Sequence, residues 1–229
     1  MKKILLLIIL ISASLTSFSQ SISYGIRGGV NFAELQASSV EFGGSQNTGN
    51  LTTFSAGVFA DFKFGHVSIQ PGLFINGKGG KENAYLNDGD MTVSENEKIS
   101  LIYVQLPVDL VYHIPVVVGN IYFGAGPYFA AGLSGRLKAN ISVTSVSDPS
   151  QNQNTTIDQS AKFGNNADSD FKTSEVGANI MGGVKFKSGF IIHVNYDFGL
   201  TNILSDAATA EGAAKLKNRI FGVSVGYAF

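Results

Sequence analysis

His193 and Asp197 come nearest, among the residues of this chain, to a catalytic pair in type and spacing. They stand four residues apart, so on a strand, where side chains alternate, both would face the same side. A histidine oriented by an acid could activate a nucleophilic serine. No serine is evidently placed with this pair, and the other two histidines, His66 and His113, fall near predicted strand ends. We therefore interpret His193 as a member of a polar network, and we expect no enzyme.

Two further motifs could suggest a ligand. Asn87-Asp88-Gly89-Asp90 is rich in calcium-type oxygen ligands, but it lacks the spacing and the distal Glu of an EF-hand loop, and it favours a turn. Gly124-Ala-Gly126 resembles the start of a dinucleotide fingerprint. Phe129 occupies the position of the third glycine, and the motif lies inside a predicted strand. We expect no metal and no cofactor.

Eight alternating segments are the elements that would position these side chains. They span residues 22–32, 54–64, 67–75, 100–112, 121–133, 176–186, 190–200 and 221–229. In the last segment an apolar face alternates with a face of small residues. The apolar face comprises Phe221, Val223, Val225, Tyr227 and Phe229. Such a strand suits a wall between lipid and a crowded lumen, although a soluble sandwich could also contain one.

The N-terminal residues have the layout of a secretory signal peptide. Lys2 and Lys3 precede an apolar run over residues 4–11, which is too short to span a membrane. Small residues follow, and we place cleavage between Ser19 and Gln20. This divides the chain into a leader, residues 1–19, and one domain, residues 20–229.

Composition narrows the class of the exported domain. The formal net charge is −1, and loss of Lys2 and Lys3 would lower it to about −3, which argues against nucleic acid as a partner. The chain has no Cys, so neither a disulfide framework nor a lipoprotein anchor is expected. No later segment resembles a transmembrane helix, so a membrane protein with this sequence would be a closed barrel.

The connections between the predicted strands alternate in length. Those at 65–66, 114–119 and 188–189 are short, whereas those at 36–52, 78–98, 135–173 and 202–216 are long and polar. Within 135–173, Leu137, Ala139, Ile141 and Val143 alternate, so we expect the strands to extend first above the membrane as a hairpin. Outer-membrane barrels have short periplasmic turns and long extracellular loops. The sequence therefore predicts an all-β, eight-stranded antiparallel transmembrane barrel of OmpA/OmpX size, placed in the outer membrane as a monomer.

A barrel of this size is just wide enough for its own side chains. Five charged residues fall on the predicted inward faces: Arg27, Asp61, Asp109, Lys185 and Asp197. Buried charges need partners, and we expect a structural network in which Arg27 pairs with Asp61. The alternative interpretation is that these charges line an ion path or gate.

Several stretches resemble one family in order along the chain. They are Gly25-Ile-Arg-Gly-Gly-Val-Asn-Phe32, Gly57-Val-Phe-Ala-Asp-Phe62 with Gln70-Pro71-Gly72-Leu73, Tyr103-Val-Gln-Leu-Pro107, Ala125-Gly-Pro-Tyr128, and 196–202 with Asn218-Arg219. The chain resembles the PorT-like outer-membrane β-barrel family of Bacteroidota over the whole exported part. The resemblance implies location and architecture. One founding member is tied to type IX secretion and gliding, and no residue carries that role onto this chain.

The leading functional hypothesis is an outer-membrane barrel with a structural or surface-interaction role and a filled lumen. The alternative is a narrow channel or an accessory of a type IX-like secretion or gliding system, and a lipid-modifying enzyme is a weaker alternative. Expected partners are membrane lipid, the barrel-assembly machinery, and an extracellular or secretion-system protein bound through residues 135–173. For the general class of such barrels, Val225, Tyr227 and Phe229 would act as the assembly signal.

Overall fold

The computed structural model of the chain describes residues 21–39, 44–145, 147–148, 150, 152–164, 166, 168–206 and 215–229. The predicted leader, residues 1–19, and its cleavage site lie outside the described residues. Within the described part of the chain, no helix is long and apolar enough to cross a membrane.

The described residues form antiparallel strands of very unequal length. Their bounds are β1 Ser21–Ser39, β2 Gly44–Asn47, β3 Leu51–Phe64, β4 Val67–Asn87, β5 Met91–Val116, β6 Gly119–Ser145, β7 Gln153–Ser160, β8 Ser174–Phe186, β9 Phe190–Gly199 and β10 Lys215–Ala228. Each of the eight predicted strands corresponds to one observed strand, and these are β1, β3, β4, β5, β6, β8, β9 and β10. Only the predicted strands 190–200 and 221–229 run past the observed ones, by one residue each.

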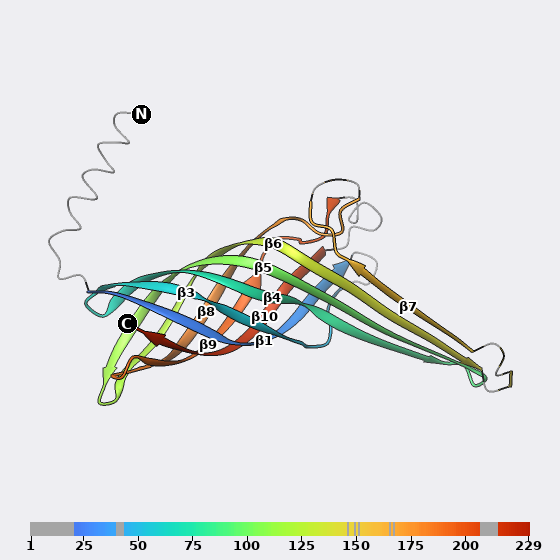
Figure 1. Cartoon of the computed structure of the whole chain (residues 1–229), viewed down its shortest axis with the longest axis horizontal. Coiled ribbons are helices and arrows are strands. Elements are labelled where there is room, and N and C mark those ends of the chain that lie inside the picture. The colour runs from blue at the N-terminus through green and yellow to red at the C-terminus, as the bar shows by residue number, and fades with distance from the viewer. Residues whose placement is uncertain are drawn as a thin grey trace.

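The sheet closes on itself (Figure 1). Strands are paired in the order β10-β9-β8-β6-β5-β4-β3-β1, and β1 also pairs with β10 from Gly25↔Ala228 to Ser38↔Lys215. Two short strands lie beside this ring, because β2 pairs with the end of β1 and β7 pairs with β6. Because β1 and β10 pair with each other, neither leaves a free strand edge along their paired length.

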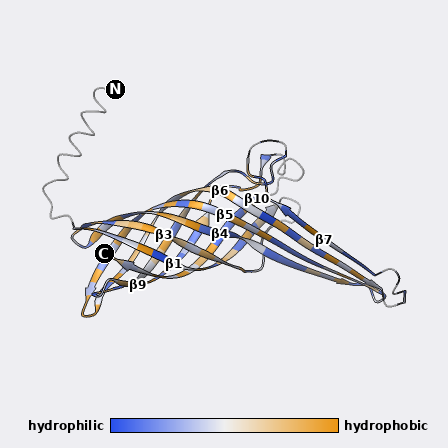
Figure 2. Cartoon of the chain, in the orientation of Figure 1, coloured by the Kyte–Doolittle hydropathy of each residue, from blue (hydrophilic) through white to orange (hydrophobic). Residues whose placement is uncertain are grey.

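The two faces of the closed sheet have opposite character, as the alternation predicts. Large apolar side chains point outward, and Ile26, Leu110 and Phe129 are 52%, 62% and 52% exposed. Polar side chains point inward, and Asp109 and His193 are each only 2% exposed. Figure 2 shows apolar and polar residues alternating along the strands of the closed part of the sheet. An apolar exterior around a polar interior is the reverse of a soluble protein and is typical of a barrel in lipid.

Residues 78–98, expected as a loop, are mostly strand, and the hairpin expected at the start of 135–173 is present. β4 and β5 continue as a hairpin through residues 78–98, which turns at Asp88 and Gly89, and Gly89 has a φ of 74°. The turn expected at Asn87 to Asp90 is confirmed, since the Asp88 N–H donates to the Met91 carbonyl at 3.0 Å. Likewise β6 runs on to Ser145, and β7 returns along it within the expected loop 135–173. Residues 78–98 differ from the expectation because a strand outside lipid needs no apolar face.

Beyond the ring, β4, β5, β6 and β7 form an extension that projects along the long axis of the molecule (Figure 1). We call residues 79–100, 136–145 and 153–160 the extension. A register shift between Ile102 and Tyr103 marks the point where β5 and β6 leave the ring.

An apolar cluster closes the end of the ring nearest the extension. Tyr103 and Tyr128 project inward from β5 and β6, and Phe171 and Ile203 from the two connecting segments pack against them. Tyr103 and Ile203 are fully buried. The connecting segments therefore fold over this end of the lumen. A second cluster fills the other half of the lumen and comprises Phe59, Phe74, Val111, Tyr122, Met181, Ile191 and Ala228.

Candidate functional site

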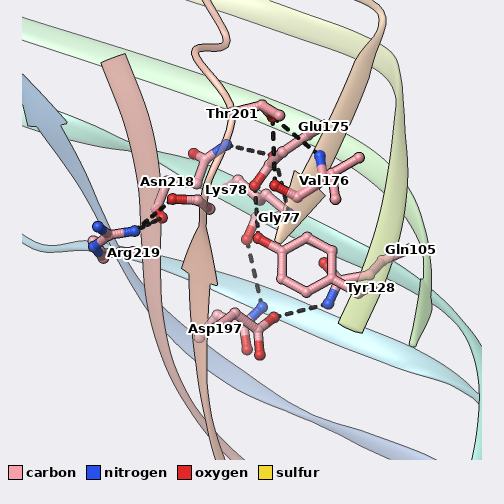
Figure 3. Close-up of polar contacts among 12 residues, drawn as sticks. Gly77, Lys78, Gln105, Tyr128, Glu175, Val176, Asp197, Thr201, Asn218 and Arg219 are labelled. Carbon is pink, nitrogen blue, oxygen red and sulfur yellow. Dashed lines mark hydrogen bonds and ion pairs between the residues drawn. The ribbon is translucent and has the colours of Figure 1, made fainter. Parts of the chain in front are cut away.

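The lumen of the closed sheet is the candidate site, and Glu175 is the centre of its polar network near the extension. Its carboxylate accepts a hydrogen bond from Lys78 Nζ at 3.2 Å, from the Tyr128 hydroxyl at 2.7 Å and from Asn218 Nδ2 at 2.8 Å. Figure 3 shows these groups converging from four strands. Lys78 and Glu175 have no exposed surface, so the pair is fully withdrawn from solvent.

Aromatic rings complete the surroundings of Lys78. Its Nζ lies 5.0 Å from the ring centre of Tyr103 and 4.6 Å from that of Tyr128. An ammonium between two ring faces is stabilised by the negative potential of those faces. The charge of Lys78 is thus balanced by one carboxylate and two aromatic rings.

Asp197 continues the network toward the middle of the lumen (Figure 3). Gln105 Nε2 donates to one of its oxygens at 2.9 Å, and Asn195 Nδ2 donates to the other at 2.8 Å. Asp197 is 2% exposed, and its carboxylate is held by the two side-chain amides.

Arg27 anchors a second group. Its Nη1 lies 2.9 Å from His193 Nδ1, and the Tyr122 hydroxyl lies 2.9 Å from the same nitrogen. The guanidinium also lies over the rings of Phe59 and Phe74, at 5.2 and 4.9 Å from their centres. Arg27 is therefore held by an imidazole and two rings.

The expected pair of Arg27 with Asp61 is wrong. The β1–β3 register places Ser23 opposite Asp61 and Gly57 opposite Arg27, so the two charges lie four residues apart along the wall. Asp61 instead lies 3.8 Å from His113 Nε2. Sequence alone gave the correct face of both strands but not the offset between them, because that offset is set by the β3–β1 connection and the closure with β10.

A third polar group lies near the short turns. Ser68 Oγ and His113 Nε2 are 2.8 Å apart. Lys185 Nζ donates to Ser23 Oγ at 3.3 Å. Together with Asp61 these groups line the end of the lumen away from the extension.

Between the groups lies a polar cavity of about 30 Å³. Four of the buried oxygens that line it have no hydrogen-bond partner: Asn76 Oδ1, Gln105 Oε1, Asp109 Oδ1 and Asn179 Oδ1. A space of this size has room for about one or two water molecules, and water would satisfy these acceptors. The size and polar lining of this cavity suit bound water.

All five residues expected in the lumen network lie on inward faces, but the fully buried ion pair was missed. Asp61, Asp109 and Asp197 are buried, and Arg27 and Lys185 are partly buried. Lys78 and Glu175 were not proposed. Lys78 continues the inward register of Phe74 and Asn76, and Glu175 continues that of Gly177. Extending the two predicted strands by a few residues, with the same alternation, would therefore have placed both charges in the lumen.

His193 has a serine beside it after all. Ser224 is its direct neighbour in the β9–β10 register, and both face the lumen. They are 2% and 8% exposed, and His193 Nδ1 is already shared by Arg27 and Tyr122. Both side chains are buried, and the arrangement suits a structural polar network.

The residues expected as an assembly signal lie on the outer face at the end of β10. Val225, Tyr227 and Phe229 are 53%, 43% and 73% exposed. The rings of Tyr227 and Phe229 meet edge to face, with centres 5.2 Å apart.

Residues 18–205 match the family described as outer membrane protein beta-barrel domain. The chain belongs to this family. Membership implies the outer membrane as its location, and it accounts for the apolar exterior and polar interior of the closed sheet.

The chain is also similar to solved barrels, at low identity. Neisserial surface protein A is 11% identical with a TM-score of 0.37, over 91% of this chain and 99% of that one. Ail, the attachment invasion locus protein of Yersinia pestis, is 11% identical with a TM-score of 0.35, over 90% of this chain and 99% of that one. The N-terminal β-barrel domain of Pseudomonas aeruginosa OprF is 10% identical with a TM-score of 0.32, over 90% of this chain and 97% of that one. No curated protein sequence matches the chain.

Proposed function

We propose that this chain is an eight-stranded transmembrane barrel with a closed lumen, and that its role is structural or in surface interaction. The wall would consist of β1, β3, β4, β5, β6, β8, β9 and β10, with β2 and β7 outside it. The observation that carries the proposal is the filling of the lumen. Lys78 and Glu175 cross it as a buried ion pair, Tyr103 and Tyr128 pack around them, and Phe171 and Ile203 cover that end.

A conductance measurement tests the closed lumen. The full chain, refolded and inserted in a planar bilayer, should show no steady current. The double variant Tyr103→Ala/Tyr128→Ala removes the two rings next to Lys78 and should leak, which shows that the assay detects an opened lumen. A steady ohmic current from the unmodified chain would favour the runner-up function, a narrow channel, for which the polar cavity beside Asp109 is the supporting feature.

The extension is the proposed extracellular surface. Short turns and the C-terminal end of β10 lie at one end of the ring and the extension lies at the other (Figure 1). With the short turns in the periplasm, an epitope tag inserted within residues 151–154 should be labelled on intact cells. Labelling only after the outer membrane is opened would reverse the orientation.

Export and assembly complete the proposal. A leader at residues 1–19 would deliver the chain, and Val225, Tyr227 and Phe229 would be recognised by the barrel-assembly machinery. Deletion of Phe229 should lower the amount of heat-modifiable barrel and leave protein in the periplasm, whereas unchanged levels would remove Phe229 from that role.

We also propose that, within the family, the chain belongs to the PorT-like branch of Bacteroidota. The support is the order of the short motifs from Gly25 to Arg219. A part in type IX-like secretion or gliding would require neighbouring genes for such a system, and co-purification of the chain with its components.

A further inference from the structure

The charged residues on the paired strands of the extension, outside the turn that contains Asp88 and Asp90, are sorted by face. On the face that continues the outer, lipid-facing register, four of the five charged side chains are basic, and they are Lys81, Lys98, Arg136 and Lys138 with Asp158 as the fifth. On the face that continues the lumen register, the charged side chains are all acidic, and they are Glu82, Glu95 and Glu97. Nothing in a β-sheet requires this separation, since alternating signs across neighbouring strands would stabilise it better.

The basic residues are crowded in one row. Lys81 pairs in register with Lys98, Lys98 with Lys138, and Lys138 with Asp158. Like charges directly opposite one another on neighbouring strands are destabilising. The sheet therefore keeps an arrangement that disfavours its own folding, and an anion bound across the row would relieve it.

One carboxylate serves part of the row. Asp158 accepts hydrogen bonds from Arg136 Nε and Nη2 at 2.6 and 2.8 Å and lies 3.3 Å from Lys138 Nζ. Among the described residues, no ion pair is formed by Lys81 or Lys98, and both are exposed. The row thus offers at least two exposed ammonium groups on neighbouring strands.

The ammonium groups of the row can reach the lipid headgroups. On β5 the outer apolar residues extend from Ile114 to Ile102, which is about 30 Å along the membrane normal for strands tilted by about 40°. That is close to the hydrocarbon thickness of a typical bilayer, about 30 Å. Lys98 lies about 10 Å beyond Ile102, where a headgroup layer is about 5–8 Å thick. Lysine side chains turn back along such a surface, so their ammonium groups reach that layer.

We propose that Lys81, Lys98, Lys138 and Arg136 form a binding surface for the phosphate of an anionic lipid headgroup of the surrounding membrane. The inference rests on the proposed membrane orientation of the barrel and adds a specific ligand to it. Charge complementarity and continuity with the lipid-facing apolar residues favour this occupant. Ammonium and guanidinium groups are suited to phosphate, and the outer register leads directly from lipid tails to these side chains.

Lipid binding by the full chain in zwitterionic detergent tests the proposal. Native mass spectrometry would count bound phosphatidylglycerol, with phosphatidylcholine as the zwitterionic comparison that carries no net charge. The unmodified chain should retain phosphatidylglycerol selectively, and added salt should weaken the binding because the charges are exposed. The variant Lys81→Gln/Lys98→Gln should bind about 25-fold more weakly, about fivefold for each charge lost.

Two further variants keep the result interpretable. Lys162→Gln/Lys187→Gln removes the same charge from exposed positions outside the row and should bind normally. Lys81→Arg/Lys98→Arg keeps the charge and should also bind normally, which separates loss of binding from loss of folding.

Three outcomes would overturn the proposal. They are equal retention of both lipids, equal loss in the Lys162 and Lys187 control, and displacement of the lipid by millimolar inorganic phosphate, which would indicate a free-anion site. Self-association that depends on Lys81 and Lys98 would instead assign the row to the acidic face of a second copy. Epitope labelling of the extension tests the orientation separately, so failure of one proposal is distinguishable from failure of the other.

Discussion

Two lysine–carboxylate pairs in this molecule have almost the same separation in very different surroundings. Lys78 and Glu175 are 3.2 Å apart inside the lumen and have no exposed surface. Lys138 and Asp158 are 3.3 Å apart on the extension, and 45% and 32% of their side-chain surfaces are exposed. From the distance alone, the two pairs would be expected to contribute equally to stability. Because the first pair is buried, losing one partner should strongly lower the stability of the barrel. Because water surrounds the second pair, losing it should change the stability little.

Breaking the lumen pair should have the largest effect. Lys78→Met leaves Glu175 buried without a cation, which typically costs about 3–5 kcal/mol of unfolding free energy. Glu175→Gln leaves Lys78 buried without an anion and should cost a similar amount. The double variant Lys78→Met/Glu175→Gln should cost clearly less than the two single changes together, because the neutral amide can still accept from Tyr128. Urea unfolding of the refolded barrel measures all three, and additivity within about 0.5 kcal/mol would refute the coupling.

Two glycines extend the comparison from charge to packing. A Cβ at Gly177 would clash with the Tyr128 ring in the lumen, so Gly177→Ala should lower barrel stability by about 1–3 kcal/mol. Gly89, at the tip of the extension, has a φ of 74° and open space around it. Gly89→Ala should therefore strain only the turn and increase hydrogen exchange there, with the urea midpoint of the barrel unchanged. Equal midpoints for the two variants would mean that ring and extension unfold as one unit.

The stability of the extension should depend on pH through the protonation of Glu97. Partial burial, and then the nearby Glu95 and Glu82, raise the pKa of Glu97 above its ordinary value. A raised carboxyl pKa means that the folded extension is favoured when Glu97 is protonated, and this advantage is lost as pH rises through the folded pKa. Glu97→Gln should therefore increase the hydrogen-exchange protection of residues 91–100 at pH 7. At pH values below the ordinary glutamate pKa the variant and the unmodified chain should agree, and a difference that persists there would exclude titration as the cause.

Breaking the exposed pair should have the smallest effect. Hydrogen bonds from Arg136 lower the pKa of Asp158, so the pair is present above the ordinary aspartate pKa and is lost as pH falls through the lower folded value. Because solvent screens both groups, Lys138→Met, Asp158→Asn and the double variant should leave the urea midpoint of the barrel within repeat error. A shift as large as that of Lys78→Met would show that exposure does not separate the two pairs.

The sequence by itself determined the strands and their faces. Alternation placed Ile26, Leu110 and Val225 outside and Asp109, Asp197 and His193 inside, because side-chain direction along a strand has a period of two and needs no knowledge of neighbours. The alternation and the unequal connections also led to an outer-membrane β-barrel, in agreement with the family that the chain matches, whereas the PorT-like branch stays a proposal. The turn at Asn87 to Asp90 was predictable for the same reason, since its hydrogen bonds are local.

Only the tertiary structure decided which inward groups meet. Arg27 contacts His193 and not Asp61, because pairing across the lumen depends on the offset of each strand and on closure between β1 and β10. Lys78 and Glu175 are 97 residues apart and come together only when the ring is closed. The strands over residues 78–98 were missed for a different reason. Outside lipid a strand can be polar on both faces, so its backbone pairing, rather than an apolar pattern, determines that it is a strand.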